Sequence, residues 1–292
     1  MLLIFNPAAG ARRRRRFERV AGALAETGVR FTVADTAAAG DAERLASEAV
    51  AQGERIVVAA GGDGTIAEVA NGIAGTDASL GVIPIGTANV FAHELGLPFA
   101  PAAIAAMLAA RRTRVVRPGR ACFDDGRTRL FIQMLGVGFD AAVVAALDTA
   151  LKRRIGKGAY VVETLRQLAS WRFPRLSLAI DGVPRDAAQV IATKGRFYGG
   201  RFLLAPGAAP DHAGVMACVF DRGGPGAAAL AGAALPLGLL ARLPGFSAGP
   251  AATLAVLGPA GLPVQADGDL VGRTPVVVDD QAAPLAVIVP RA

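Results

Sequence analysis

The length, composition and charge of the chain exclude several classes of protein. With 292 residues, 53% of them hydrophobic, it can bury a core in one large domain or in two. Its formal net charge of +7 favours anionic partners, namely a nucleotide or an acidic membrane surface. No aromatic residues interleave the basic clusters at 12–16 and 152–157, and no zinc, RNA-recognition or helix-turn-helix pattern occurs. We therefore expect no nucleic-acid partner.

The sequence favours a cytoplasmic location. No uninterrupted apolar run reaches the roughly 18–20 residues that a membrane span needs. The start, Met1 to Pro7, lacks the basic and long apolar regions of a signal peptide and resembles a first strand. Cys122 and Cys218 lie in apolar contexts typical of reduced core residues, with a pairing between them left open.

The first part of the chain alternates strand and helix patterns. Short apolar, β-branched runs are typical of buried parallel strands, and apolar residues three and four apart are typical of helices. This order predicts a doubly wound α/β domain at residues 1–118, with ligands bound at the carboxyl ends of its strands. Strands are expected at 2–5, 30–34, 56–60 and 80–83, and helices at 13–26, 42–52, 66–73, 90–95 and 101–111.

The pattern changes near Arg117-Pro118-Gly119. Residues 119–284 contain many short strand-like runs separated by turn residues, which predicts a β-sandwich domain. Two helical interruptions are expected, at 143–169 and 226–240. The expected strands are 120–123, 130–135, 176–180, 190–193, 215–220, 252–256, 264–266 and 275–278.

Residues 56–71 contain the strongest chemical signal. The strand at 56–60 breaks into Gly61-Gly62-Asp63-Gly64-Thr65, here called the glycine loop, and helical spacing resumes at Ile66. Glycines let the backbone approach a ligand, and a helix N-terminus presents unpaired N–H groups and a positive dipole end. Asp63 is a candidate Mg²⁺ ligand, and Thr65 adds a hydroxyl. The loop therefore predicts a phosphate site, whereas a capped strand-to-helix turn would need only one glycine.

The glycine loop resembles the Gly-Gly-Asp-Gly-Thr loop of the diacylglycerol kinase catalytic-domain family, soluble lipid kinases related to sphingosine and ceramide kinases. NAD kinases and phosphofructokinases carry similar loops, so the flanking segments decide between them. Segments similar to this family's motifs run in order along nearly the whole chain: Asn6-Pro7-Ala8-Ala9-Gly10, Pro84-Ile85-Gly86-Thr87-Ala88-Asn89-Val90-Phe91-Ala92, Gly136-Val137-Gly138-Phe139-Asp140-Ala141, Tyr198-Gly199-Gly200, Ala205-Pro206 and Asp267-Gly268-Asp269.

The resemblance implies an ATP-dependent lipid kinase that phosphorylates a hydroxyl of diacylglycerol or a related lipid. It implies a nucleotide-binding α/β domain like that of NAD kinase and phosphofructokinase, a C-terminal β-sandwich domain for the lipid, and an active site in the cleft between them. In the family the last segment returns to the first domain, so residues 285–292 are expected there. ATP and Mg²⁺ are the implied cofactors.

The nucleotide site is expected to draw on several loops. Phosphoryl transfer needs held phosphates, a metal ion that neutralises charge, and a base for the incoming hydroxyl. Thr36 matches a family threonine that lines the nucleotide site, and Glu68 either faces the cleft or acts as a capping residue. The expected nucleotide-binding set is Asn6, Gly10, Thr36, Gly61, Gly62, Asp63, Gly64, Thr65, Glu68, Thr87 and Asn89.

Two segments carry the remaining catalytic expectations. The resemblance implies that Asp267 is the catalytic base. The family's Asp-Gly-Glu motif is Asp267-Gly268-Asp269 here, so the second catalytic acid, Asp269, is one methylene shorter than the family's glutamate. An Asp-Gly dipeptide is also typical of a hairpin turn. The family's Asp-Gly-Leu segment, associated with an accessory Mg²⁺, corresponds to Ala213-Gly214-Val215, so alanine takes the place of the aspartate. Asp211, two residues earlier, is a metal ligand only if the loop is rearranged.

The expected lipid partner rests on composition. Residues 226–246, rich in Ala and Leu, interrupt the β-domain where the family's helical insertion lines an acyl pocket; an ordinary core helix is the alternative. The basic cluster at 152–157 suits peripheral docking on an anionic membrane, at roughly 1 kcal/mol per basic residue near the surface. Two other functions stay open, an NAD kinase and a nucleotide- or lipid-binding protein that has lost catalysis. The assembly state is also open, a homodimer included.

Overall fold

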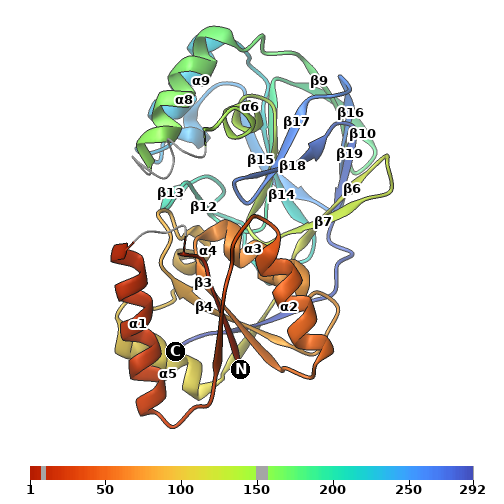
Figure 1. Cartoon of the computed structure of the whole chain (residues 1–292). Helices are drawn as coiled ribbons and strands as arrows, with labels where there is room; N and C mark the ends of the chain where they lie inside the picture. Colours follow the sequence, from red (N-terminus) through yellow and green to blue (C-terminus); the bar gives the residue numbers. More distant parts are fainter. Residues whose placement is uncertain (8–10, 149–156, 292) are drawn as a thin grey trace. The chain divides into compact units, whose positions relative to one another are not determined.

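The computed structural model describes residues 1–7, 11–148 and 157–291 (Figure 1). It divides into two compact units, unit 1 with Met1–Val116 and Ala283–Ala292, and unit 2 with Arg117–Ala282. Gly10 and the basic residues 152–154 lie outside the described residues. Within the described ranges, no helix is long and apolar enough to cross a membrane.

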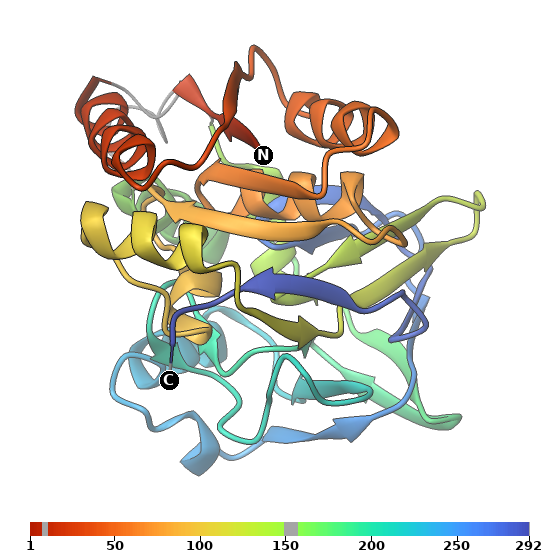
Figure 2. The same cartoon turned by 90° about the horizontal axis from the view of Figure 1, so that it is seen from below.

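Unit 1 is built around one six-stranded sheet. Its elements are β1 (Leu2–Phe5), α1 (Ala11–Glu26), β2 (Thr32–Asp35), α2 (Asp41–Ala51), β3 (Ile56–Gly61), α3 (Asp63–Gly72), β4 (Ser79–Pro84), α4 (Val90–Glu94), α5 (Pro101–Ala110), β5 (Thr113–Val116) and β20 (Leu285–Ile288). The strand order is β2-β1-β3-β4-β20-β5, and only the β20–β5 pair is antiparallel. Figures 1 and 2 show α1 and α5 against one face of this sheet and α2 and α3 against the other. Because both faces are covered, β3 and β4 are buried at every residue after the first.

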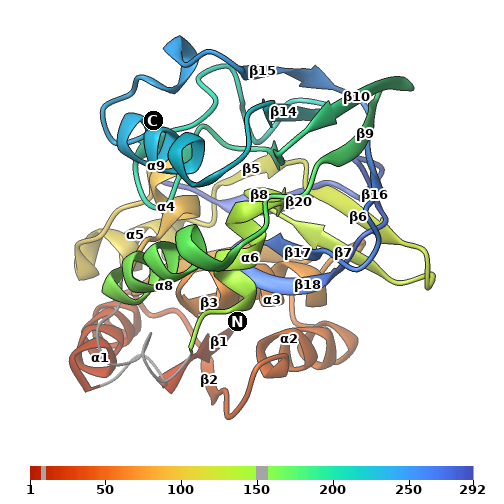
Figure 3. The same cartoon turned by 90° about the horizontal axis from the view of Figure 1, so that it is seen from above.

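Unit 2 is a sandwich of two six-stranded antiparallel sheets, with the helices α6, α8 and α9 gathered at one side (Figure 3). The sheets have the orders β10-β9-β16-β19-β6-β7 and β15-β14-β11-β8-β17-β18. The elements are β6 (Gly119–Phe123), β7 (Thr128–Phe131), β8 (Met134–Val137), α6 (Phe139–Ala145), α8 (Lys157–Ser170), β9 (Leu176–Ile180), β10 (Val183–Ala187), β11 (Gln189–Thr193), β12 (Phe197–Tyr198), β13 (Phe202–Leu203), β14 (Val215–Phe220), α9 (Pro225–Ala234), η2 (Leu240–Arg242), β15 (Phe246–Ala251), β16 (Leu254–Gly258), β17 (Pro263–Ala266), β18 (Asp269–Arg273) and β19 (Val276–Asp279).

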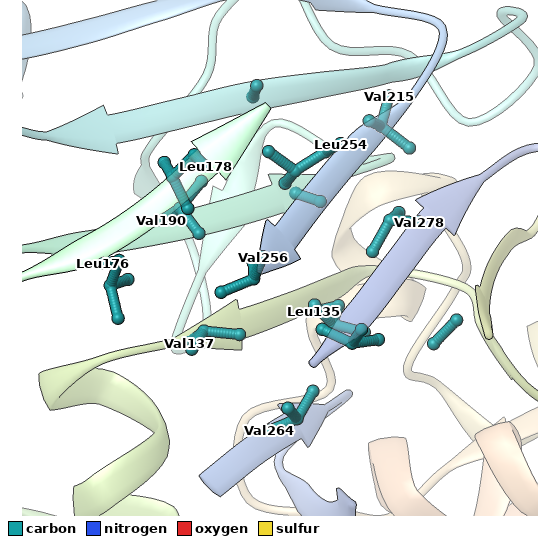
Figure 4. Close-up of a cluster of buried hydrophobic side chains, with 14 of the residues drawn as sticks. Leu135, Val137, Leu176, Leu178, Val190, Val215, Leu254, Val256, Val264 and Val278 are labelled. Carbon is teal, nitrogen blue, oxygen red and sulfur yellow. The ribbon is translucent and has the colours of Figure 1, made fainter. Parts of the chain in front are cut away.

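The core of unit 2 lies between its two sheets. Side chains alternate along each strand, so Leu176 and Leu178 on β9 are buried while Ser177 is exposed. Figure 4 shows such inward side chains from both sheets, with Val190 beside Leu178 and Leu135 between Val256 and Val264. This packing of two sheets confirms the expected fold class, a doubly wound α/β domain with a C-terminal β-sandwich.

Three expected elements differ from the structure. The single strand expected at 130–135 is two strands, β7 and β8, because the chain turns at Ile132 and Gln133, where its N–H groups bond to a side chain instead of a neighbouring strand. The helix expected at 226–240 ends at Ala234, because Pro236 has no N–H with which to continue the helical hydrogen bonds. Of the helix expected at 143–169, the structure has α6 and α8, and residues 149–156 lie outside the described part.

Candidate phosphate and acceptor sites

The glycine loop lies at the carboxyl end of β3 and forms the first turn of α3. Gly62 is extended, with no side-chain cap, and the first helical bond runs from the Ile66 N–H to the Gly62 carbonyl at 3.1 Å. The N–H groups of Gly64 and Thr65 therefore have no acceptor inside the helix. Together with the positive end of the helix dipole they favour an anion at this turn.

Close packing explains Gly61, inside this loop, and Gly86, in the second loop that lies against it. A Cβ on Gly86, after β4, would lie less than 3.0 Å from the Gly62 Cα and 2.7 Å from Asn89 Oδ1. A Cβ on Gly61 would lie 2.8 Å from Thr65 Cγ2. The loops after β3 and β4 thus meet backbone to backbone, at the end of the sheet where parallel folds bind ligands.

Other expected residues lie beside this loop. The Asn6 amide, directly after β1, donates to Thr65 Oγ1 at 3.2 Å, and the Asn6 N–H donates to the Ala60 carbonyl at 3.1 Å. Thr36, directly after β2, is buried, and its N–H donates to the Phe5 carbonyl at 2.9 Å. The ends of β1, β2 and β3 therefore converge as the sequence predicts, and Gly10 cannot be placed because it lies outside the described residues.

Thr87 binds a cationic side chain beside the glycine loop, and Asn89 has a buried acceptor atom without a donor. Arg13, in the first turn of α1, donates to Thr87 Oγ1 at 2.6 Å. Asn89 has a left-handed backbone (φ 49°), and its amide donates to the Gly86 carbonyl at 3.1 Å. Its Oδ1 is buried without a hydrogen-bond partner. The sequence marked a cluster of five arginines but gave no sign that Arg13 is the one that meets this loop.

Two acids of the expected nucleotide set bind backbone groups instead of facing open space. Asp63 Oδ1 accepts the Phe91 N–H at 3.1 Å, which ties the start of α4 to the glycine loop. Burial raises the pKa of Asp63, while the N–H groups of Phe91 and its neighbours act in the opposite direction. The Glu68 carboxylate accepts the N–H groups of Gly40 at 2.9 Å and Ala42 at 3.1 Å, so it has the capping role that the sequence left as an alternative.

Asp267 lies in a tight hairpin turn of unit 2. Ala266 pairs with Asp269, so Asp267 and Gly268 form a two-residue turn with φ values of 51° and 90°. The Asp267 carboxylate is 8% exposed and accepts three backbone N–H groups, at 2.8 to 3.0 Å. Asp269, by contrast, is exposed at the start of β18. The donors to Asp267 belong to Ile132, Gln133 and Met134.

A buried network that the sequence reasoning missed supports this turn. Asp140 accepts hydrogen bonds from the Tyr198 hydroxyl and from Gln265 Nε2, the latter at 2.8 Å, and Gln265 Oε1 accepts the Gly268 N–H at 3.0 Å. Burial raises the pKa of Asp140, although both hydrogen bonds oppose that shift; the pKa of Tyr198 lies well above its ordinary value because of burial and the Asp140 charge. Asp140 and Tyr198 both lie in segments that match the family's motifs. A carboxyl group and a phenol in such segments were the signal from which this network could have been predicted.

The residues expected for an accessory Mg²⁺ do not fit a metal ion. Asp211 lies on the loop 209–214, and the ammonium of Lys194 donates to the carbonyls of His212, at 2.7 Å, and Gly214. Asp211 and Asp280 attract that ammonium, and Asp280 also accepts the Gly214 N–H at 2.5 Å. Across the described ranges, no three His, Cys, Asp or Glu side chains gather into a metal-binding group.

Two family models match the chain. The diacylglycerol kinase catalytic domain matches residues 1–121, and the YegS C-terminal NAD kinase beta sandwich-like domain matches residues 133–291. The chain belongs to the diacylglycerol kinase catalytic-domain family. The glycine loop and Arg13 lie in the part matched by the first model of this family, and Asp140, Lys194 and Asp267 in the part matched by the second.

Curated relatives in this family are named "probable lipid kinase YegS-like". The one from Pseudomonas putida is 36% identical over 189 residues, which are 63% of this chain and 62% of that protein. The one from Xanthomonas axonopodis pv. citri is 39% identical over 153 residues, which are 50% of this chain and 49% of that protein. The matches thus span between about half and three fifths of these relatives.

Solved structures establish the fold. A crystal structure of a diacylglycerol kinase from Bacillus anthracis strain Sterne has a TM-score of 0.73 at 22% identity, covering 99% of this chain and 96% of that chain. A second structure from the same strain has a TM-score of 0.76 with the same coverage.

Proposed function

We propose that this protein is an ATP-dependent lipid kinase that transfers the γ-phosphoryl group of ATP to a hydroxyl of diacylglycerol or a related lipid. One observation carries the proposal: a helix N-terminus, two loops packed backbone to backbone and one arginine meet at the carboxyl end of a parallel sheet. Membership of the family and the names of the relatives support it. The protein would work in the cytoplasm and contact the membrane during turnover.

ATP fits the chemistry of unit 1. The N–H groups of Gly64 and Thr65 and the Arg13 guanidinium suit phosphate oxygens. The buried Asn89 Oδ1 lacks a donor, which an adenine amine or a ribose hydroxyl would supply. Mg²⁺ would come with the nucleotide, because such ions bind mainly through substrate phosphates and retain several waters. Bound MgATP supplies the phosphoryl group and neutralises its charge.

Asp267 is the proposed acceptor-side residue. Three backbone N–H groups bond to the Asp267 carboxylate and hold it in place. Asp267 would orient a substrate hydroxyl and accept its proton. A loose phosphoryl-transfer transition state needs little help from a strong base, so positioning is the larger contribution. Asp269, exposed two residues later, is proposed as the second acid.

The lipid and membrane contact is proposed for the helices of unit 2. Val161 and Leu165 on α8 are 60% and 63% exposed, and Leu230 on α9 and Leu237 after it are 56% and 69% exposed. The two helices lie side by side (Figure 3). Large apolar side chains on adjacent helices favour a hydrophobic partner, and Arg242 nearby suits an anionic bilayer.

The deciding experiment is transfer of radiolabel from γ-labelled ATP in the presence of Mg²⁺. The acceptors are diacylglycerol, monoacylglycerol, phosphatidylglycerol and sphingosine in mixed micelles, with NAD in a parallel reaction. Label in a lipid supports the proposal and names the acceptor class. Label only in NAD makes the protein an NAD kinase. No label, with ATP binding intact, points to a binding protein that has lost catalysis.

A further inference from the structure

Lys194 is a buried lysine whose position resembles that of a bound cation. It follows β11 directly and is 2% exposed. Lysine is almost never fully buried without partners. Its ammonium donates to the carbonyls of His212 and Gly214, while His212 and Ala213 are themselves exposed. The loop therefore turns its backbone carbonyl oxygens inward, toward this one positive charge.

The surroundings of Lys194 are those of a cation site. The carboxylates of Asp280 and Asp211 attract the ammonium, and Arg117 opposes it. Asp280 also holds the loop directly, through the Gly214 N–H, and the Arg117 N–H donates to the Pro210 carbonyl at 2.8 Å. Carbonyl and carboxylate oxygens around one charge are the ligands that hard divalent ions prefer. Here the charge is part of the chain.

A metal ion and this ammonium exclude each other. Mg²⁺ binds oxygen at about 2.0–2.1 Å with near-octahedral geometry, and the carbonyls of His212 and Gly214 already accept hydrogen bonds from the Lys194 Nζ. The aspartate of the metal-associated segment that this loop resembles is also missing, because residue 213 is alanine.

We propose that the Lys194 ammonium is the fixed cation of the 209–214 loop and replaces an accessory divalent ion, so that this loop is ordered without metal. The proposal concerns unit 2 alone and is independent of which substrate the enzyme phosphorylates. If turnover requires Mg²⁺, that requirement would come from ATP. The folding of this loop would need no Mg²⁺.

The test measures the Tm of the full chain without nucleotide, in Mg²⁺ and in EDTA. The wild-type Tm should differ by less than about 1 °C between the two, because the loop has its own cation. Lys194→Met, which has similar length and no charge, should lower the Tm by about 5–10 °C, since two carbonyls and two acids lose their partner. Arg201→Met removes an exposed positive charge from the same unit and should change the Tm by less than about 1 °C.

A reverse substitution tests the replacement itself. Lys194→Ala combined with Ala213→Asp removes the ammonium and restores an acid, so its Tm should rise by several degrees in Mg²⁺ or Ca²⁺. Wild-type protein that is stabilised by Mg²⁺, or that retains one divalent ion per chain after purification, would overturn the proposal. An unchanged Tm in Lys194→Met would do the same. If Lys194→Met fails to fold, the metal content and EDTA response of the wild type still decide.

Discussion

The contact between the loops after β3 and β4 gives the sharpest prediction. Gly86→Ala would place a Cβ less than 3.0 Å from the Gly62 Cα and 2.7 Å from Asn89 Oδ1. The obstacle on one side is backbone, which cannot rotate away as a side chain can. The loops must therefore separate, and the first turn of α3 must move with them.

The size of the effect follows from two opposing contributions. Overpacking a close contact costs about 1–3 kcal/mol, and replacing glycine restricts the unfolded chain and returns about 0.4–1 kcal/mol. We expect a net loss of about 1–2 kcal/mol in the free energy of unfolding, and a Tm lower by about 3–8 °C. A phosphate site displaced by about 1 Å should weaken ATP binding by about tenfold, or 1.4 kcal/mol.

Two matched variants make this prediction quantitative. A Cβ on Gly62 would lie 3.3 Å from the Gly86 Cα, so Gly62→Ala should cost less than Gly86→Ala. Gly22, inside α1, has nothing within 4 Å of the added Cβ, so Gly22→Ala should stabilise by about 0.5–1 kcal/mol. Calorimetry gives the Tm, and titration with ATP gives the dissociation constant. Wild-type Tm and ATP affinity in Gly86→Ala would refute both the packing and the location of the site.

Three further predictions concern single side chains. Arg13→Gln should weaken ATP binding about tenfold through loss of a charge-assisted contact. Arg15→Gln, on the exposed face of α1, should leave the dissociation constant for ATP unchanged. Equal effects of the two substitutions would refute the assignment of Arg13 to the phosphate site. Asp267→Asn should abolish turnover and leave ATP affinity within about threefold. It should lower the free energy of unfolding by about 1–3 kcal/mol, because the amide N–H₂ would face the N–H of Ile132 while the amide oxygen keeps the other two donors. Near-normal turnover would exclude the acceptor role. The pKa of Asp140 is raised in the folded state, so the folded protein binds more protons than the unfolded chain. The contribution of Asp140 to stability is therefore full below the ordinary pKa of 3.8 and is lost as pH rises through the folded pKa. The stability of Asp140→Asn should fall less across this range than that of the wild type, and an unchanged pH profile would contradict the shift.

The sequence predicted most inner strands of the six-stranded sheets, although β20 was expected only as a segment that returns to unit 1. It missed β5, β10, β15 and β18, each of which ends the order of its sheet, and the two short strands β12 and β13. An edge strand is half exposed and tolerates proline, so it lacks the continuous apolar run that identifies an inner strand. Pro184 in β10 and Pro250 in β15 are examples. Periodicity therefore finds strands that are buried on both sides.

The candidate site was predictable in its backbone and less so in its side chains. A glycine loop between a strand and a helix has one main geometry, so the helix N-terminus at Asp63 followed from the pattern. The partners of long side chains did not, because they depend on which loops meet in space. Arg13 reaches a residue 74 positions away, and Asp267 one 135 positions away. Contacts at that separation have no local signature in a single sequence.

Two acids near the proposed phosphate site share a task that bears on its charge. Asp63 and Glu68 bind the N–H groups at the starts of α4 and α2. A carboxylate that faced the glycine loop would repel a phosphate, whereas one committed to backbone donors fixes a loop and adds little negative charge to the open site. Helix N–H groups and Arg13 then determine the local potential. Removing Arg13 should therefore affect the affinity for ATP more than the stability of unit 1.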